Sequence, residues 1–156
     1  MARKTLELML VLLIAGCSRE AGPRLLPHPV PDQQVASALS GVCLEILEVH
    51  QTEGRYEIVY ELTNLGGEAP GYGEYAALEK MMKDGWYGII YSDAVFYRNP
   101  EFIDYGEMLR PGATERMTLD TGDLGTVLTP GTYRLVKTIT GTDGFEYSVA
   151  AEFEIK

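Results

Sequence analysis

Cysteine and histidine, which most often build metal and nucleophilic sites, are scarce in this chain of 156 residues. There are two of each, and neither pair has the close spacing of zinc ligands. The chain also lacks Gly-x-Ser-x-Gly, phosphate-loop, dinucleotide-binding and His-Glu-x-x-His motifs. These absences predict a protein that is not an enzyme and holds no cofactor or metal. His50 is expected on the surface.

Basic residues are also few. Lys and Arg total 13 against 23 Asp and Glu, which gives a net charge of −10. A protein that binds nucleic acid or anionic head groups needs a basic patch to neutralise phosphates. We therefore expect no nucleic-acid partner.

The abundant carboxylates form close pairs by chance. Glu101, Asp104 and Glu107 are assigned to a solvated surface, with general acid–base chemistry as the alternative. Asp120 and Asp123 flank a turn, with calcium binding as the alternative.

Long apolar runs are absent except near the N-terminus. There, an uncharged stretch over residues 8–15 follows Arg3 and Lys4. A positive start, a short apolar stretch and small residues at the cut are the parts of a secretory signal. The stretch is much shorter than the roughly 20 residues that a transmembrane helix needs. Residues 1–16 are therefore predicted to be a signal peptide.

Residues 13–17, Leu-Ile-Ala-Gly-Cys, resemble a bacterial lipobox. The resemblance implies cleavage before Cys17 and attachment of diacylglycerol and palmitate to it. The protein would then be lipid-anchored at the extracytoplasmic face of the cell membrane. Ser18 is not the aspartate that often signals inner-membrane retention, so an outer-membrane location stays open. An ordinary secretory signal with an incidental cysteine is the alternative.

Lipidation would leave Cys43 without a partner, which excludes an internal disulfide. Cys43 lies in residues 42–46, which are apolar except for Glu45, and we expect a small buried side chain there. Residues 17–40 contain four prolines and little periodicity, which predicts a flexible Pro-rich tether after the lipidated cysteine. A helical turn over residues 33–39 is the alternative.

From Gly41 onward the pattern has period two and no long helical segment. In residues 55–64, Tyr56, Ile58, Tyr60 and Leu62 would share one face of a strand. The expected strands cover residues 42–50, 55–64, 76–82, 86–91, 115–120, 131–140 and 145–155. Asp-Gly at 84–85 is a hairpin signal that favours a type I′ turn. About seven such strands predict an all-β antiparallel sandwich over residues 41–156.

Residues 128–133 add a specific feature to the predicted sandwich. Leu128-Thr129-Pro130-Gly131-Thr132-Tyr133 is typical of a tyrosine corner, in which the hydroxyl bonds to upstream backbone. A plain turn followed by a core tyrosine is the alternative.

An ordered series of motifs carries a family resemblance. It includes Tyr-Gly-Glu-Tyr at 72–75, Asp-Gly-Trp-Tyr at 84–87, Arg-Pro-Gly at 110–112, Gly-Thr-Tyr-Arg-Leu-Val-Lys at 131–137 and Ala-Glu-Phe-Glu-Ile at 151–155. Together they resemble a bacterial immunoglobulin-like domain of envelope lipoproteins, mostly of Gram-positive bacteria. The resemblance implies an immunoglobulin-like sandwich in an extracytoplasmic setting, without established catalytic residues.

Aromatic residues gather in and before the long segment 92–105. Trp86, Tyr87, Tyr97, Phe102 and Tyr105 are the candidate ligand contacts, because rigid aromatic rings offer contact area at low entropic cost. Packing in the core is the alternative for several of them.

These observations predict a lipid-anchored, non-enzymatic binding or scaffolding module of the cell envelope. Its expected partners are the membrane, through the lipid on Cys17, and an envelope protein, peptide or glycan. The alternative function is a proteinase inhibitor that acts through residues 92–105.

Overall fold

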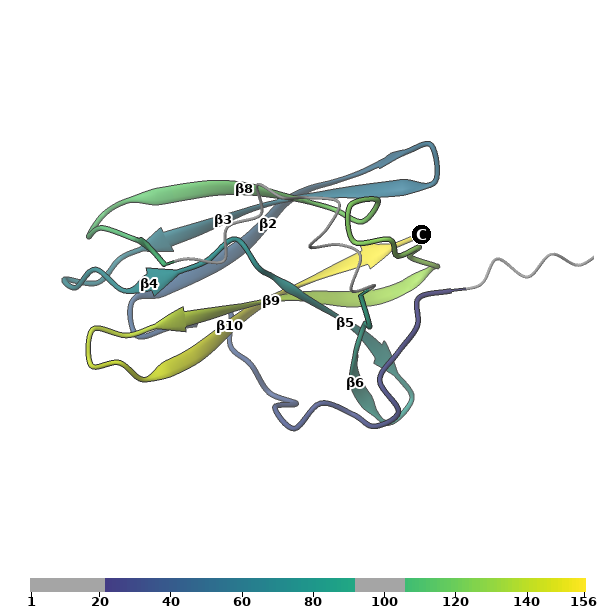
Figure 1. Ribbon diagram of the computed structural model, residues 1–156, viewed down its shortest axis with the longest axis horizontal. Helices are drawn as coiled ribbons and strands as arrows, with labels where there is room; N and C mark the ends of the chain where they lie inside the picture. Colours follow the sequence, from purple (N-terminus) through teal and green to yellow (C-terminus); the bar gives the residue numbers. More distant parts are fainter. Residues whose placement is uncertain (1–21, 92–105) are drawn as a thin grey trace, which may run out of the picture.

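The computed structural model describes residues 22–91 and 106–156, which form ten strands and no helix. Two antiparallel sheets pack as a sandwich, which confirms the predicted fold class (Figure 1). The first sheet has the order β1-β2-β3-β8, formed by Ala38–Leu39, Val42–Thr52, Arg55–Asn64 and Thr114–Asp120. The second contains β4 (Gly71–Tyr72), β5 (Ala77–Met82), β6 (Gly85–Gly88), β7 (Glu107–Met108), β9 (Gly131–Thr140) and β10 (Glu146–Ile155).

In the second sheet, β9 is central. It pairs with β10 on one edge, and with β5 and then β4 on the other. β6 extends the sheet beyond β5, and β7 extends it beyond β4. Three strands that the sequence did not predict, β1, β4 and β7, are only two residues long.

The core lies between the two sheets and follows from period-two alternation. In β3 the buried positions are those predicted: Tyr56, Ile58, Tyr60 and Leu62. Tyr133, Leu135 and Ile139 of β9 meet them from the second sheet. Lys137 is also fully buried, and its ammonium donates to the carbonyl oxygens of Gly73 and of Tyr75 (2.7 Å) between β4 and β5.

The type I′ turn predicted at Asp84-Gly85 is wrong. Met82 pairs with Gly85, so Lys83 and Asp84 are the loop residues, and neither has positive φ. Gly85 has φ of 140° and lies so close to Gln33 Oε1 that a Cβ would overlap it. Glycine is favoured here chiefly because residues with a side chain rarely adopt this φ, although the turn is not of type I′.

The β2–β3 hairpin does have the backbone of a type I′ turn. Thr52 pairs with Arg55, and Glu53 and Gly54 between them have φ of 50° and 80°. The β1–β2 turn repeats this pattern at Ser40 and Gly41. Positive φ at both central residues matches the twist of the flanking strands.

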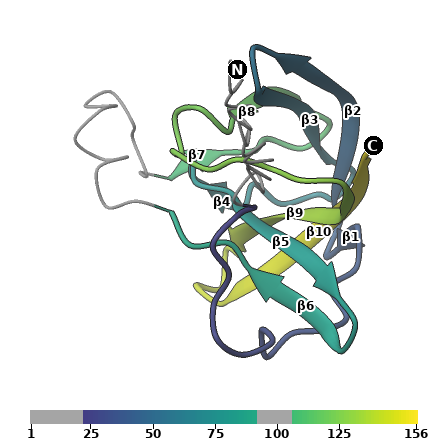
Figure 2. The same ribbon diagram turned by 90° about the vertical axis from the view of Figure 1, so that its right-hand side faces the viewer.

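Residues 22–37, called the strap here, pack against the domain instead of forming the predicted flexible tether. The Leu26 amide donates to Gly88 O (2.8 Å) and the Val30 amide to Trp86 O (2.9 Å). Further along, Ala36 O accepts a bond from Ala150 (2.9 Å). Figure 2 shows the strap curving around the β5–β6 hairpin. The strap hydrogen-bonds to backbone groups at the outer edge of β6, which are therefore not open to another strand. The alternative of a helical turn over residues 33–39 is wrong, since no helix forms there.

Cys43 is half-buried, not fully buried as the sequence suggested. Its neighbours Val42 and Leu44 enter the core, so alternation along β2 turns Cys43 to the outer face of the sheet.

Candidate functional site

The buried side chain of Arg134 holds the strap against the domain. Arg134 is 2% exposed, and its Nε donates to Glu79 Oε2 at 2.6 Å. Its Nη2 and Nη1 donate to the strap carbonyls of Asp32 (2.6 Å) and Gln33 (3.1 Å). The guanidinium also lies 4.7 Å from the ring centroid of Trp86. Arg134 therefore joins β9, β5, β6 and the strap in one network.

The predicted contact residues Trp86 and Tyr87 have different surroundings. Trp86 is 4% exposed and covered by Arg134, so it offers almost no surface to a ligand. Tyr87 is half-buried, and its hydroxyl donates to Asp84 Oδ2 at 2.8 Å. This hydrogen bond raises the pKa of Tyr87 above its usual value.

The other predicted site residues lie outside the described residues. They are Cys17, Tyr97, Phe102 and Tyr105, together with Glu101, Asp104 and the rest of segment 92–105.

The tyrosine corner is confirmed. The buried Tyr133 hydroxyl donates to Thr129 O at 2.6 Å and accepts from the Thr129 amide at 3.1 Å. Its ring stacks on Phe153 with centroids 5.7 Å apart, and Lys80 Nζ lies 5.2 Å from the ring centroid. These contacts hold the bend before β9 against the core.

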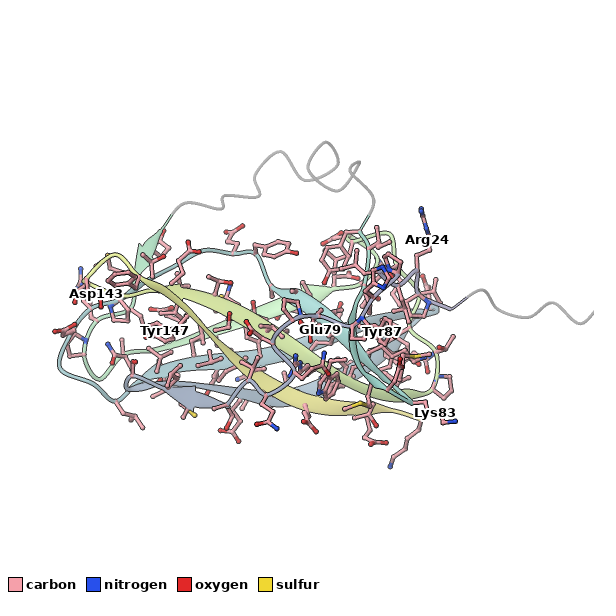
Figure 3. The ribbon with its side chains drawn as sticks, turned by 90° about the horizontal axis from the view of Figure 1, so that it is seen from below. Arg24, Glu79, Lys83, Tyr87, Asp143 and Tyr147 are labelled. Atoms are coloured by element: carbon pink, nitrogen blue, oxygen red, sulfur yellow. The ribbon has the colours of Figure 1, made fainter. Side chains whose placement is uncertain are left out.

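The strongest candidate for a binding surface is one end of the sandwich, called the distal end here. It is formed by the turn at 40–41 and the loops at 65–70 and 141–145, which surround a cleft of about 450 Å³. Phe145 lines the cleft and is 75% exposed, and Leu65, 78% exposed, directly precedes the lining residue Gly66. Figure 3 shows Asp143 at this end and Arg24 of the strap at the opposite end.

A buried asparagine holds the first of these loops. The Asn64 side-chain amide donates to Glu68 O (2.6 Å) and to Leu109 O (2.8 Å), and its Oδ1 accepts from the Gly66 amide (2.8 Å). The Leu65 amide donates to Gly41 O at 2.7 Å. The backbone that carries Leu65 is therefore fixed while its side chain stays in solvent.

The second loop is held in the same way. The Phe145 amide donates to Asp143 Oδ1 at 3.1 Å, and its carbonyl accepts from the Gly141 amide at 2.8 Å. Gly144 has φ of 83°, which suits a glycine in this bend. The Thr142 hydroxyl bonds to a carboxylate oxygen of Glu68, which links the two loops.

The cleft is acidic. Glu68, Asp143 and Glu146 are among its lining residues, and no lysine, arginine or histidine is. Arg110 lies on the neighbouring turn before β8, outside the lining. Burial and the Asp143 carboxylate raise the pKa of Tyr147, which also lines the cleft, so this phenol stays neutral.

The sequence predicted no site in either distal loop, and Phe145 was expected to begin the strand 145–155, which starts at Glu146 instead. The missed signal is an apolar residue within turn-forming sequence. Leu65 stands between Asn64 and two glycines, and Phe145 follows Asp-Gly. That the two loops are neighbours depends on long-range pairing of β9 with β4, which local sequence does not reveal.

Groups of three or more metal-ligating side chains are absent from residues 22–91 and 106–156. His50 Nε2 lies 2.6 Å from Glu48 Oε2 on the exposed surface. Asp120 Oδ1 accepts from the Gly122 amide at 2.7 Å, which is ordinary turn chemistry. The same residues contain no helix long and apolar enough to cross a membrane.

Comparison with known proteins points to one family. The family described as "Bacterial Ig-like domain" matches residues 39–154. No curated protein matches the chain.

Several solved structures are similar to the chain. A structural genomics target named SoR45 is 16% identical, with 75% of this chain and 88% of that one covered and a TM-score of 0.45. The putative ApaA protein of Bordetella pertussis is 18% identical (85% and 86% covered, TM-score 0.40). The archaellum periplasmic stator protein FlaG of Sulfolobus acidocaldarius is 17% identical (72% and 99% covered, TM-score 0.39). All three scores are below 0.5, so no functional inference rests on them.

Proposed function

The chain belongs to the family of bacterial Ig-like domains, and we propose that it is a lipid-anchored binding module at the extracytoplasmic face of the cell membrane. Membership of this family supports the role of a non-enzymatic surface module. Beyond family membership, the proposal comprises a lipid anchor at Cys17 and a ligand-binding surface at the distal end.

The N-terminal sequence supports the anchor. A charged start, an apolar stretch and the Leu-Ile-Ala-Gly-Cys run precede the domain. Two acyl chains of a diacylglycerol give stable membrane binding, whereas a single chain binds only marginally.

The docked strap supports a close attachment to the membrane. Only six residues lie between Cys17 and Arg24, so seven residue-to-residue steps join them, and the Arg24 carbonyl accepts a bond from the Ile90 amide at 2.8 Å. An extended chain spans about 3.5 Å per residue, so this linkage reaches at most about 25 Å. A fully flexible spacer over residues 17–40 would have allowed the domain a much wider range of positions. The short linkage favours an orientation with the distal end away from the lipid.

The observation that carries the binding role is the pre-ordered distal end. Two large apolar side chains, Leu65 and Phe145, are exposed on loops whose backbone is held by hydrogen bonds next to each of them. Binding sites are often placed on loops of a rigid scaffold, and loops that are already ordered lose little entropy on binding. An envelope protein, peptide or glycan is the proposed partner class.

Labelling of growing cells with radioactive palmitate tests the anchor. We expect label on the wild-type chain and on Cys43→Ala, and none on Cys17→Ala. The Cys43→Ala variant is the matched control because it removes the other cysteine. Label that persists on Cys17→Ala, or an unlabelled wild-type chain, would contradict the proposed anchor.

A further inference from the structure

We propose that the distal end binds a cationic segment of a partner polypeptide, which packs apolar side chains against Leu65 and Phe145. This inference rests on the proposed binding role and names the chemical class of the partner. It is carried by exposed apolar surface, by the acidic cleft between the loops and by the lack of ion pairs to the cleft carboxylates within residues 22–91 and 106–156.

The apolar contacts come first. Phe145 lines the cleft, Leu65 adjoins the lining residue Gly66, and the half-exposed Leu39 adjoins the lining residue Ser40. Grouped exposed apolar residues of this kind typically mark a site of interaction. A Cβ on Gly41 would come within 2.8 Å of the Gly66 backbone, so the turn and the loop are packed closely against each other.

The charge of the cleft selects the partner. Glu68, Asp143 and Glu146 line it, and none of these carboxylates forms an ion pair with a lysine or arginine in the described part of the chain. Such uncompensated negative charge attracts cations and repels anionic polymers or lipid surfaces. A second copy of this acidic chain, with a net charge of −10, would be repelled as well.

A cationic polypeptide fits both the exposed apolar side chains and the negative charge of the cleft. Lysine and arginine side chains supply positive charge next to apolar side chains that can cover Leu65 and Phe145. A neutral glycan would leave the carboxylates uncompensated, and a small cation would leave the apolar residues exposed.

Binding of defined synthetic peptides to the full-length chain in neutral detergent tests this assignment. The probes are fluorescent ten-residue peptides composed of Lys, Leu, Phe and Gly, of Lys, Ser and Gly, or of Glu, Leu, Phe and Gly. Fluorescence anisotropy should show the tightest binding for the first peptide. Its dissociation constant should rise at least about tenfold when salt is raised from about 50 mM to about 500 mM.

Variants separate the two contributions. Leu65→Ser combined with Phe145→Ser should weaken binding of the first peptide about tenfold or more, because the apolar contact is lost. Glu146→Gln should also weaken binding and reduce its salt dependence. Glu146 is the most suitable carboxylate to replace because Glu68 and Asp143 hydrogen-bond within the loops. The matched controls Met82→Ser and Val127→Ser remove exposed apolar groups outside the distal end and should leave binding unchanged.

The inference would be overturned by equal binding of the anionic peptide, by equal weakening in the control variants, or by a concentration-dependent dimer that the double variant abolishes. A glycan or an acidic protein identified at the distal end in cells would overturn this inference alone and leave the binding role intact. Absence of lipid on Cys17 would remove the anchor without affecting the peptide result.

Discussion

Tyr133 makes two of the hydrogen bonds that hold the bend before β9. Its hydroxyl both donates to and accepts from the backbone of the half-buried Thr129, and the tyrosine itself has no exposed surface. Buried backbone groups that lose their partner cost more free energy than an average hydrogen bond supplies. The effect of removing this single oxygen is therefore measurable.

Tyr133→Phe is expected to lower the free energy of unfolding by about 1–3 kcal/mol, because both Thr129 groups lose a partner. Tyr87→Phe is the matched control, since its exposed bond to Asp84 should be worth less than about 0.5 kcal/mol. Urea denaturation of both variants measures the difference. Equal effects of the two substitutions would show that the corner contributes nothing specific.

Among the elements, the strap depends most on side chains that are distant in sequence. Arg134 donates to two of its carbonyls, and Gln33 Oε1 accepts from the Trp86 amide at 2.8 Å. Without these side-chain bonds the strap would still have its backbone bonds to β6, to Ile90, to the start of β2 and to β10.

Arg134→Met should release the strap and lower the free energy of unfolding by about 3–5 kcal/mol, because Glu79 would be left buried without its partner. Hydrogen exchange should accelerate at the Leu26 and Val30 amides while those of β3 remain protected. Arg55→Met, which breaks only an exposed ion pair, is the control. It should change neither the free energy of unfolding nor the hydrogen exchange of the strap amides. Unchanged exchange at Leu26 in Arg134→Met would contradict this role.

A substitution in the β2–β3 turn is expected to stabilise the fold. Glu53 has φ of 50°, a region that asparagine occupies more readily than glutamate. Glu53→Asn is expected to raise the free energy of unfolding by about 0.5–1 kcal/mol. The same replacement at Asp84, where φ is not positive, should give no gain. A larger gain at Asp84, measured by thermal or urea unfolding, would refute this assignment of turns.

The sequence reveals local elements of this fold well and long-range ones poorly. Alternation in residues 55–64 and the motif ending at Tyr133 follow from neighbouring side chains, so they predict the strand and the corner correctly. The strap shows no periodicity, because backbone bonds to β6 and a single arginine 100 residues away hold it. Turn-forming neighbours can mark Leu65 and Phe145 individually, but the two residues share one surface only after the sheets assemble, so local sequence does not predict that surface.

For the whole molecule, buried tyrosines predict the response to alkali. Burial is the main cause that raises the pKa of Tyr60 and that of Tyr91 well above the usual value. A raised folded-state pKa means that the fold favours the neutral phenol. Its contribution is therefore complete below the unfolded pKa of about 10 and is lost as pH rises through the folded value.

We expect the free energy of unfolding to be nearly constant from about pH 8 to about pH 10 with respect to these tyrosines and to fall above that range. Absorbance of tyrosinate should show that Tyr60 and Tyr91 ionise only as the protein unfolds. Complete ionisation of all ten tyrosines in a protein that is still folded would contradict the burial of Tyr60 and Tyr91.

The start of the strap, at Arg24, and the distal end, at Asp143, lie at opposite ends of the sandwich (Figure 3). This arrangement would let one end serve the membrane and the other a partner. A lipid anchor confines the domain to a surface, where the effective concentration of neighbouring partners is high and weak contacts suffice.

Photo-crosslinking in intact cells tests this account most directly. A benzoylphenylalanine in place of Phe145 keeps an aromatic ring at the distal end, and the same group in place of Met82 is the control on the β5–β6 hairpin. The account predicts a defined adduct from position 145, none from position 82, and loss of the adduct when Leu65→Ser is added. Equal adducts from both positions, or none from position 145 in a chain that reaches the envelope, would contradict a binding role for the distal end.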